Sequence, residues 1–267
     1  MSLLEEYKRF EEIYLRYKNE NKIDFSTINF VYPSFILPLY YLTHGKNCKM
    51  VPNKQENVNS YIVSVLGNIT GNKNNKSTLC PITFLPKDES LKEKVIEKFS
   101  SVFENGKYSG GQNAFLSYIG EISDNIYQHS KFSNAYILGQ RYPSKKFIEI
   151  CIVDNGITIP KNFEENKIIF EKDYEAIFNA INGTTTKKDF QRGYGLCSSI
   201  NMIVKGLNGE FLIASRKGVV YITPKEIKTY EIKMFKGTLI AFRIPLSEHK
   251  LDIYKYADSK GVQIQKV

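Results

Sequence analysis

The sequence is poor in the residues that bind transition metals or form disulfides. It has four cysteines and three histidines among 267 residues. The cysteines are widely spaced with no CxxC pair, and the histidines lie far apart along the chain, so we expect neither a zinc site nor a disulfide framework. We interpret the cysteines as reduced, mostly buried thiols, which are typical of a cytoplasmic protein.

Long hydrophobic runs are also absent. No apolar segment approaches the roughly 20 residues that a membrane-spanning helix needs. The N-terminal segment MSLLEEYKRFEEIYLRYKNE is too rich in charged residues for a signal peptide. We therefore expect a soluble, cytoplasmic protein that makes no contact with a membrane.

The bulk composition is that of a globular protein. Hydrophobic residues make up 42% of the chain and aromatic residues 13%, and the length allows one large domain or two small ones. The net charge of +9 favours anionic partners such as nucleotides or nucleic acid. A lysine-rich surface that serves only solubility would give the same net charge. The charge by itself therefore selects no partner.

The first residues carry a helical pattern. Apolar and aromatic side chains recur at steps of three or four over residues 3–20, which predicts an amphipathic helix. The side chains that form the stripe are Leu3, Tyr7, Phe10, Tyr14 and Tyr17. We expect this helix to pack on its own chain, with homodimer formation as the alternative.

One segment separates two regions of different pattern. Residues 67–81, GNITGNKNNKSTLCP, are dense in Gly, Asn, Lys and Ser and lack apolar periodicity, which is typical of a linker or loop. We therefore predict a small N-terminal α/β domain over residues 1–78, a STAS-like or other adaptor domain. A second domain is expected over residues 79–246, and residues 247–267 are expected to form a charged C-terminal tail.

The second region alternates helical and strand patterns. Helices are predicted at 88–105, 110–130 and 197–207, and strands at 82–86, 134–143, 145–156, 209–216, 218–223 and 237–246. The strand at 145–156 is nearly all apolar, so we expect it near the centre of a sheet. The pattern predicts an α+β fold, a two-layer α/β sandwich with helices on one face of a sheet. Either a mixed or an antiparallel sheet fits the pattern, and we expect a mixed one.

Three polar residues stand at intervals of four in the stretch GEISDNIYQHS. In a helix, Glu121, Asn125 and His129 lie on one face. A carboxylate in this position can orient and deprotonate an attacking water. An amide oxygen one turn on suits Mg²⁺, which takes few protein ligands and keeps several waters. A solvated helix face would give the same spacing.

The stretch VDNGITIP delivers a carboxylate at the end of an apolar strand. Asp154 can accept a hydrogen bond from an exocyclic amine. Gly156, two residues on, allows the backbone to approach a flat ring closely. A plain Asp-Asn-Gly turn is the alternative.

Glycines also precede the last predicted helix, in RGYGLCSSI. Backbone N–H groups at Gly193 and Gly195 can form an anion site there. Residues 183–189, GTTTKKD, add hydroxyls and lysines just upstream. Such glycines also serve simply to begin a helix.

Taken in order, these motifs and the Gly-Thr of the last strand resemble the GHKL superfamily. That superfamily includes gyrase, heat-shock chaperone, histidine kinase and mismatch-repair ATPases. The resemblance covers about residues 82–246 and implies the Bergerat α/β sandwich, which binds ATP and Mg²⁺.

The family's N-box matches the helix motif. The resemblance implies that Asn125 coordinates Mg²⁺ and that Glu121 is the general base. A histidine eight residues after the acid, here His129, is most similar to the bacterial anti-sigma-factor serine kinases and related histidine-kinase-like ATPases. On the same basis, His129 belongs to the nucleotide site.

The first glycine box and the last strand match the adenine site of the family. The resemblance implies that Asp154 binds the adenine amino group beside Gly156, and that Thr238 supports adenine binding through its hydroxyl. The sequence departs from the family at Thr158, which replaces a second glycine. A β-branched residue there is expected to stiffen the turn and to crowd the nucleotide.

The second glycine box and the segment before it match the phosphate site. The resemblance implies that residues 160–192 form an ATP lid, and their polar composition suits a mobile cover. The further residues expected to contact the nucleotide are Lys187 and Arg192 as cations, and Gly193, Gly195 and Leu196 in the glycine motif.

Three functions remain open at this stage. One is a slow ATPase switch, in which lid closure changes how the N-terminal region contacts a regulatory protein partner. Another is an anti-sigma-type serine/threonine kinase, in which Glu121 activates a substrate hydroxyl. The last is a regulatory module that binds ATP without hydrolysing it. Thr158, in place of the family's glycine, favours weak or slow turnover, and the net charge of +9 would allow such a module to act near nucleic acid.

Overall fold

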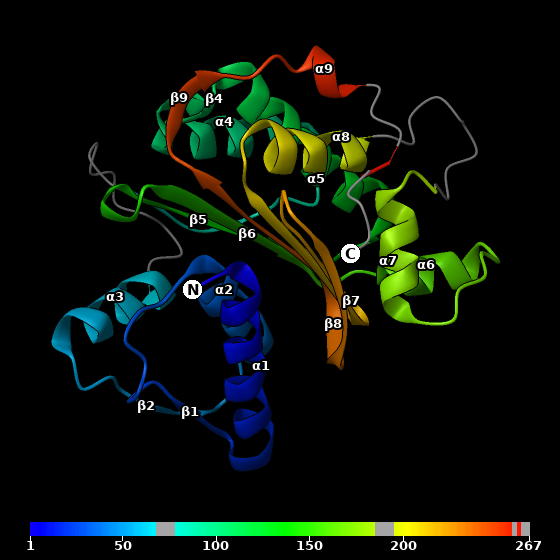
Figure 1. Cartoon of the computed structure of the whole chain (residues 1–267). Helices are drawn as coiled ribbons and strands as arrows, with labels where there is room; N and C mark the ends of the chain where they lie inside the picture. The colour runs from blue at the N-terminus through cyan, green and yellow to red at the C-terminus, as the bar shows by residue number, and fades with distance from the viewer. Residues whose placement is uncertain (68–77, 185–194, 258–260, 263–267) are drawn as a thin grey trace.

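A computed structural model describes residues 1–67, 78–184, 195–257 and 261–262, and in this part of the chain the elements form three layers (Figure 1). A sheet lies in the middle, with helices α4, α5 and α8 on one face and α1, α2 and α3 on the other (Figure 1). Helices α6 and α7 lie beside β7 and β8. No helix in these ranges combines the length and apolar character needed to cross a membrane.

The central sheet has five strands in the order β3-β5-β6-β8-β7. The strands are β3 Leu79–Phe84, β5 Ala135–Tyr142, β6 Phe147–Asp154, β7 Glu210–Ile222 and β8 Ile227–Pro245. Every neighbouring pair is antiparallel, so the mixed sheet that we expected is wrong. For two of these pairs the physical reason is connection length, because short turns join β5 to β6 and β7 to β8, and short turns can join only antiparallel strands.

The first helical layer packs on one face of this sheet. It contains α4 Lys92–Val102, α5 Gln112–His129 and α8 Gly195–Asn201, which continues as the π-helix η5 Met202–Gly206. Side chains alternate between the two faces of a strand, and Ile148, Ile150 and Ile152 of β6 belong to the core beneath these helices. These helices on the sheet are compatible with the expected α+β sandwich, but the expected two layers with helices on one face are wrong, because α1, α2 and α3 pack on the opposite face as a third layer.

The N-terminal residues cover the opposite face. They form α1 Leu3–Glu20, β1 Lys22–Asp24, α2 Pro33–Thr43, β2 Lys49–Val51 and α3 Glu56–Gly67, with β1 and β2 paired in parallel. Ser2 and Glu5 form a capping box at the start of α1. Cys151 and Val153 of β6 share one hydrophobic cluster with α1 and α2. The apolar stripe of α1 thus packs within the chain, on the second face of the sheet.

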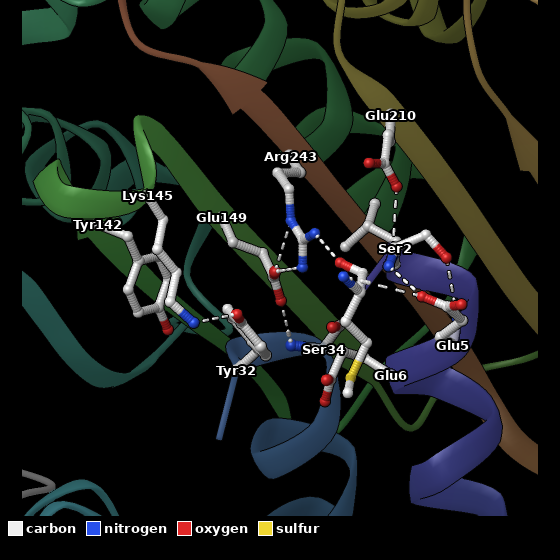
Figure 2. A network of polar contacts seen from close by, with 12 residues as sticks. Ser2, Glu5, Glu6, Tyr32, Ser34, Tyr142, Lys145, Glu149, Glu210 and Arg243 are labelled. Atoms are coloured by element: carbon white, nitrogen blue, oxygen red, sulfur yellow. Dashed lines mark hydrogen bonds and ion pairs between the residues drawn. The ribbon is translucent and has the colours of Figure 1, made fainter. Parts of the chain in front are cut away.

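A buried polar network joins this layer to the sheet (Figure 2). Arg243 of β8 donates to Glu149 of β6 at 2.6 Å and 3.1 Å, and the N–H of Ser34 in α2 donates to the same carboxylate at 2.9 Å. Glu149 and Ser34 are fully buried. The network therefore fixes α2 on the central strands through satisfied charges in the core.

The C-terminal residues return across the first helical layer. β9 Ser247–Lys250 pairs in parallel with β4 Ser109–Gly110, and α9 Tyr254–Ala257 follows. The N–H of Val262 donates to Asn182 Oδ1 at 3.1 Å. The short elements η1 Glu89–Leu91, η2 Glu104–Gly106 and η3 Pro143–Lys145 complete the described elements outside α6 and α7.

Candidate functional site

Three polar side chains stand side by side where β6, β8 and β7 meet. Asp154 is in register with Thr238, and Thr238 is in register with Ser215. Two residues along each strand, Ile152 and Ile240 belong to the core beneath α5. Because side chains two apart share a face, Asp154 and Thr238 project toward the α5 side of the sheet.

Asp154 is a buried acid at the end of its strand. Only 2% of the residue is exposed, and its Oδ1 accepts the N–H of Gly156 at 2.8 Å. Burial raises the pKa of the Asp154 carboxyl to about 7, although the hydrogen bond from Gly156 lowers it. Burial removes the water that would otherwise stabilise the ionised carboxylate. A ligand that donates hydrogen bonds to the carboxylate would stabilise the ionised form in place of that water.

Gly156 lets the turn after β6 approach the end of α5. A Cβ at this position would lie 2.0 Å from the carbonyl oxygen of Ser130, and the N–H of Ile157 donates to the same oxygen at 2.6 Å. The close approach that excludes a side chain here is therefore to protein backbone. This contact holds the strand end that carries Asp154 against the end of α5, the helix with Glu121 and Asn125.

Thr158 begins a helix that we did not expect. It is the N-cap of α6 Ile159–Glu165, and its Oγ1 accepts the N–H of Lys161 at 3.2 Å. Thr-Ile-Pro is a helix start signal, since proline favours the first turn. Thr158 thus has a local structural role as a helix cap.

The helix predicted for the stretch with Glu121, Asn125 and His129 is confirmed. Glu121, Asn125 and His129 all lie in α5 and are partly exposed. The Asn125 amide donates through Nδ2 to the carbonyl oxygen of Glu121 at 2.7 Å. This bond occupies the nitrogen end of the amide, so the oxygen end is directed away from that carbonyl, as a metal ligand requires.

Glu121 lies against the start of α8. A Cβ at Gly195, the first residue of α8, would lie 1.9 Å from Glu121 Oε2. The glycine therefore allows the carboxylate and the backbone of α8 to meet. The next residue, Leu196, is partly buried and packs against the core cluster, which anchors the first turn of α8.

Part of the expected phosphate site lies outside the described residues. Lys187, Arg192 and Gly193 fall between 185 and 194, for which no structure is described. The segment 160–192, expected as an ATP lid, contains two helices in its described part. Here α6 and α7 Asp173–Ile181 bury a set of apolar side chains: Phe163, Ala176, Ile177 and Ile181.

Arg216, which sequence reasoning missed, holds this pair of helices. It has a left-handed backbone, with φ of 54°, at a bulge in β7. Its guanidinium donates to Asp173 of α7 at 2.8 Å and also pairs with Glu164 of α6. Burial opposes ionisation of Asp173, but the bonds from Arg216 and the Lys217 N–H lower its pKa overall. The alternation of inward and outward side chains breaks between residues 216 and 218, and this break in the sequence pattern could have indicated the bulge.

The donor set suits a hard cation that needs few protein ligands. Within the residues that the structure describes, no three acidic, histidine or cysteine side chains are grouped to hold a metal ion. Asn125 supplies an amide oxygen, which fits Mg²⁺ bound largely through water and substrate oxygens. A structural zinc centre would require a denser set of ligands than this face provides.

Comparisons with known protein families and with curated proteins find no match for this chain. What the described residues provide is a chemical arrangement. A buried carboxylate and a hydroxyl lie on neighbouring strands, and a second carboxylate and an amide lie on the helix above them. Such an arrangement can accept an amine at one end and position a water or hydroxyl at the other.

Proposed function

We propose that the chain is an ATP- and Mg²⁺-binding protein of the GHKL type, which hydrolyses ATP slowly as a nucleotide-dependent regulatory switch. The observation that supports the proposal is that residues from separate sequence motifs lie on the same face of the sheet. Gly195 contacts Glu121, and Asp154 pairs with Thr238 under the same helix layer. The helix-on-sheet layers support a Bergerat-type sandwich, although the sheet is antiparallel.

The proposed adenine end is formed by Asp154 and Thr238. The carboxylate accepts a hydrogen bond from the adenine amino group, and the hydroxyl of Thr238 lies on the adjacent strand in register with it. Both residues are buried, with 2% and 8% exposed. A hydrogen bond made in this environment is stronger than one made in water, so these two residues contribute both affinity and orientation.

The proposed reaction end is formed by α5 and the start of α8. Mg²⁺, held in part by Asn125 Oδ1, would neutralise charge on the phosphates. Glu121 takes a proton from water as the water oxygen bonds to the terminal phosphorus. The bond from that phosphorus to the bridging oxygen breaks, and its electron pair leaves with ADP. Gly195 leaves room for the Glu121 carboxylate beside α8.

The experiment is incubation with terminally labelled ATP, comparing the wild type with Glu121→Ala. Glu97→Ala is the matched control, because Glu97 is an exposed glutamate on the neighbouring helix α4. We expect free phosphate from the wild type and the control, and none from Glu121→Ala, which still binds ATP.

The other outcomes separate the alternatives. Label transferred to a protein would support the serine/threonine kinase, which the N-box ending in His129 favours. Binding without turnover would support a non-catalytic module. Absence of ATP binding at millimolar concentration would refute the proposal altogether.

A further inference from the structure

Ser130 carries a buried hydroxyl that the proposed function does not use. It is the C-cap of α5, and 5% of the residue is exposed. Its Oγ makes no hydrogen bond to any residue that the structure describes, although most buried polar atoms in proteins are paired. Ser123 of the same helix is also buried with an unpaired Oγ. What distinguishes Ser130 is its position beside an ionisable group.

Backbone contacts fix Ser130 next to Asp154. The carbonyl oxygen of Ser130 accepts the N–H of Ile157 at 2.6 Å. A Cβ at Gly156 would lie 2.6 Å from the Cβ of Ser130, while the N–H of Gly156 donates to Asp154 Oδ1 at 2.8 Å. The same glycine therefore contacts both residues, and its lack of a side chain brings the Ser130 hydroxyl close to the Asp154 carboxyl.

Neutral groups set the charge state of this carboxyl. Burial raises the pKa of Asp154 to about 7, whereas the Gly156 N–H and the Ser130 hydroxyl lower it. No charged side chain in the described part of the chain adds to these causes. Its partners in β5 and β8, Ala135 and Thr238, carry no charge. The ionisable residues around the pair are Tyr41 of α2, whose pKa is raised by Asp154, and the residues that flank Ser130, His129 and Lys131.

We propose that Ser130 is a positioning residue of the base site: its hydroxyl turns to donate to the ionised Asp154 carboxylate and holds it in the form that accepts a base amino group. The inference rests on the proposed function. An ionised carboxylate can accept more hydrogen bonds than the one from Gly156. Because the Ser130 hydroxyl has no other partner among the described residues, it can turn without breaking a hydrogen bond.

The first test needs no nucleotide. Carbon NMR follows the titration of the Asp154 carboxyl, whose signal is assigned by its loss in Asp154→Asn. The wild type should titrate at about pH 7. Ser130→Ala should titrate about one pH unit higher, the effect of about one hydrogen bond to a charged group.

Three further variants control this measurement. Ser130→Thr keeps the hydroxyl and should titrate like the wild type. Ser123→Ala, which removes the other buried, unpaired hydroxyl of α5, should do the same. Ser130→Cys replaces the hydroxyl by a thiol, a weak donor of similar size, and keeps the test decisive should the alanine variant fail to fold. His129 and Lys131 are present in every variant, so their effects cancel.

The second test measures ATP affinity by calorimetry at pH 7 and pH 9. At pH 7 about half of Asp154 is ionised in the wild type, and about a tenth would be ionised in Ser130→Ala after a shift of one unit. The variant should therefore bind ATP about fivefold more weakly at pH 7. At pH 9 both proteins are mostly ionised, and their affinities should be nearly equal.

The outcomes that overturn the inference are distinguishable from failure of the proposed function. An unchanged Asp154 titration in folded Ser130→Ala and Ser130→Cys would refute the inference whether or not ATP binds. An ATP affinity that is reduced equally at pH 7 and pH 9 would indicate a packing defect and would refute it as well. Absence of ATP binding by the wild type, with the titration shift present, would refute the proposed function and the role in a base site but not the contact between Ser130 and Asp154.

Discussion

Replacing Asp154 with asparagine is expected to stabilise the nucleotide-free protein above neutral pH and to weaken its binding of ATP. Asparagine has nearly the same shape, and its oxygen can still accept the N–H of Gly156, so the change removes mainly the charge. Burial raises the pKa of Asp154 from its ordinary value of 3.8 to about 7. At ~1.36 kcal/mol per pKa unit, ionising this group in the folded protein costs at most about 4 kcal/mol.

The sign follows from proton binding in the two states. Between about pH 4 and pH 7 the folded protein holds a proton on Asp154 that the unfolded chain has released, so the stability of the wild type falls as the pH rises through this range. The variant has no such loss. The free energy of unfolding of Asp154→Asn minus that of the wild type should therefore grow by about 2–4 kcal/mol between pH 4 and pH 8.

Urea denaturation of both proteins across this pH range measures the difference. Burial also raises the pKa of Glu6 and of Glu11 to about 7, but both groups are present in both proteins and cancel. A difference that stays constant with pH would refute the burial argument. ATP affinity gives an independent check. It should rise about tenfold per pH unit up to about pH 7 in the wild type, and it should be weaker and independent of pH in the variant in this range.

Three further substitutions test the packing of the candidate site and of the sheet. Gly195→Ala should displace the Glu121 carboxylate and lower phosphate release at least about tenfold while ATP still binds, since each ~1.4 kcal/mol of lost transition-state stabilisation is tenfold. Adding it to Glu121→Ala should have no further effect on turnover. Arg216→Ala should cost about 1–3 kcal/mol in urea unfolding, because it leaves a carboxylate of α7 unpaired. Arg243→Met should cost about 3–5 kcal/mol by orphaning buried Glu149, and adding Glu149→Gln should recover much of that stability.

Local patterns predicted the elements that carry the candidate site. The apolar run ending at Asp154 predicted a central strand, and β6 lies third of five. The spacing from Glu121 to His129 predicted one helix face, and all of it lies in α5. These predictions were sound because burial on both sides makes a strand apolar, and because a helical period is set by residues close in sequence.

Strand direction and strand continuity are set by distant partners, and sequence reasoning missed them. β7 runs through the bulge at Arg216, where the alternating pattern breaks, because β8 pairs with it on both sides of the bulge. The first half of β8, from Ile227, was not predicted. Its exposed lysines and Glu231 mask the alternation of apolar and polar residues, and the strand forms because it pairs with β7, although its local propensity is weak.

The same long-range pairing bears on how a switch would work in this fold. β6 carries Asp154 on the face toward α5, while Glu149 of the same strand accepts from Ser34 of the N-terminal layer and from Arg243 of β8. A nucleotide-dependent switch, as proposed, must transmit a change at the strand end to residues 1–67. A packed sheet resists continuous deformation. Moving helices at the margin of the sheet therefore costs less free energy than deforming β6, the central strand. Helix α6 begins shortly after the Asp154 turn, and the Arg216 ion pairs hold α6 and α7 on β7. Because β7 also contacts α1, a route from the strand end to the N-terminal layer runs through α6, α7 and β7.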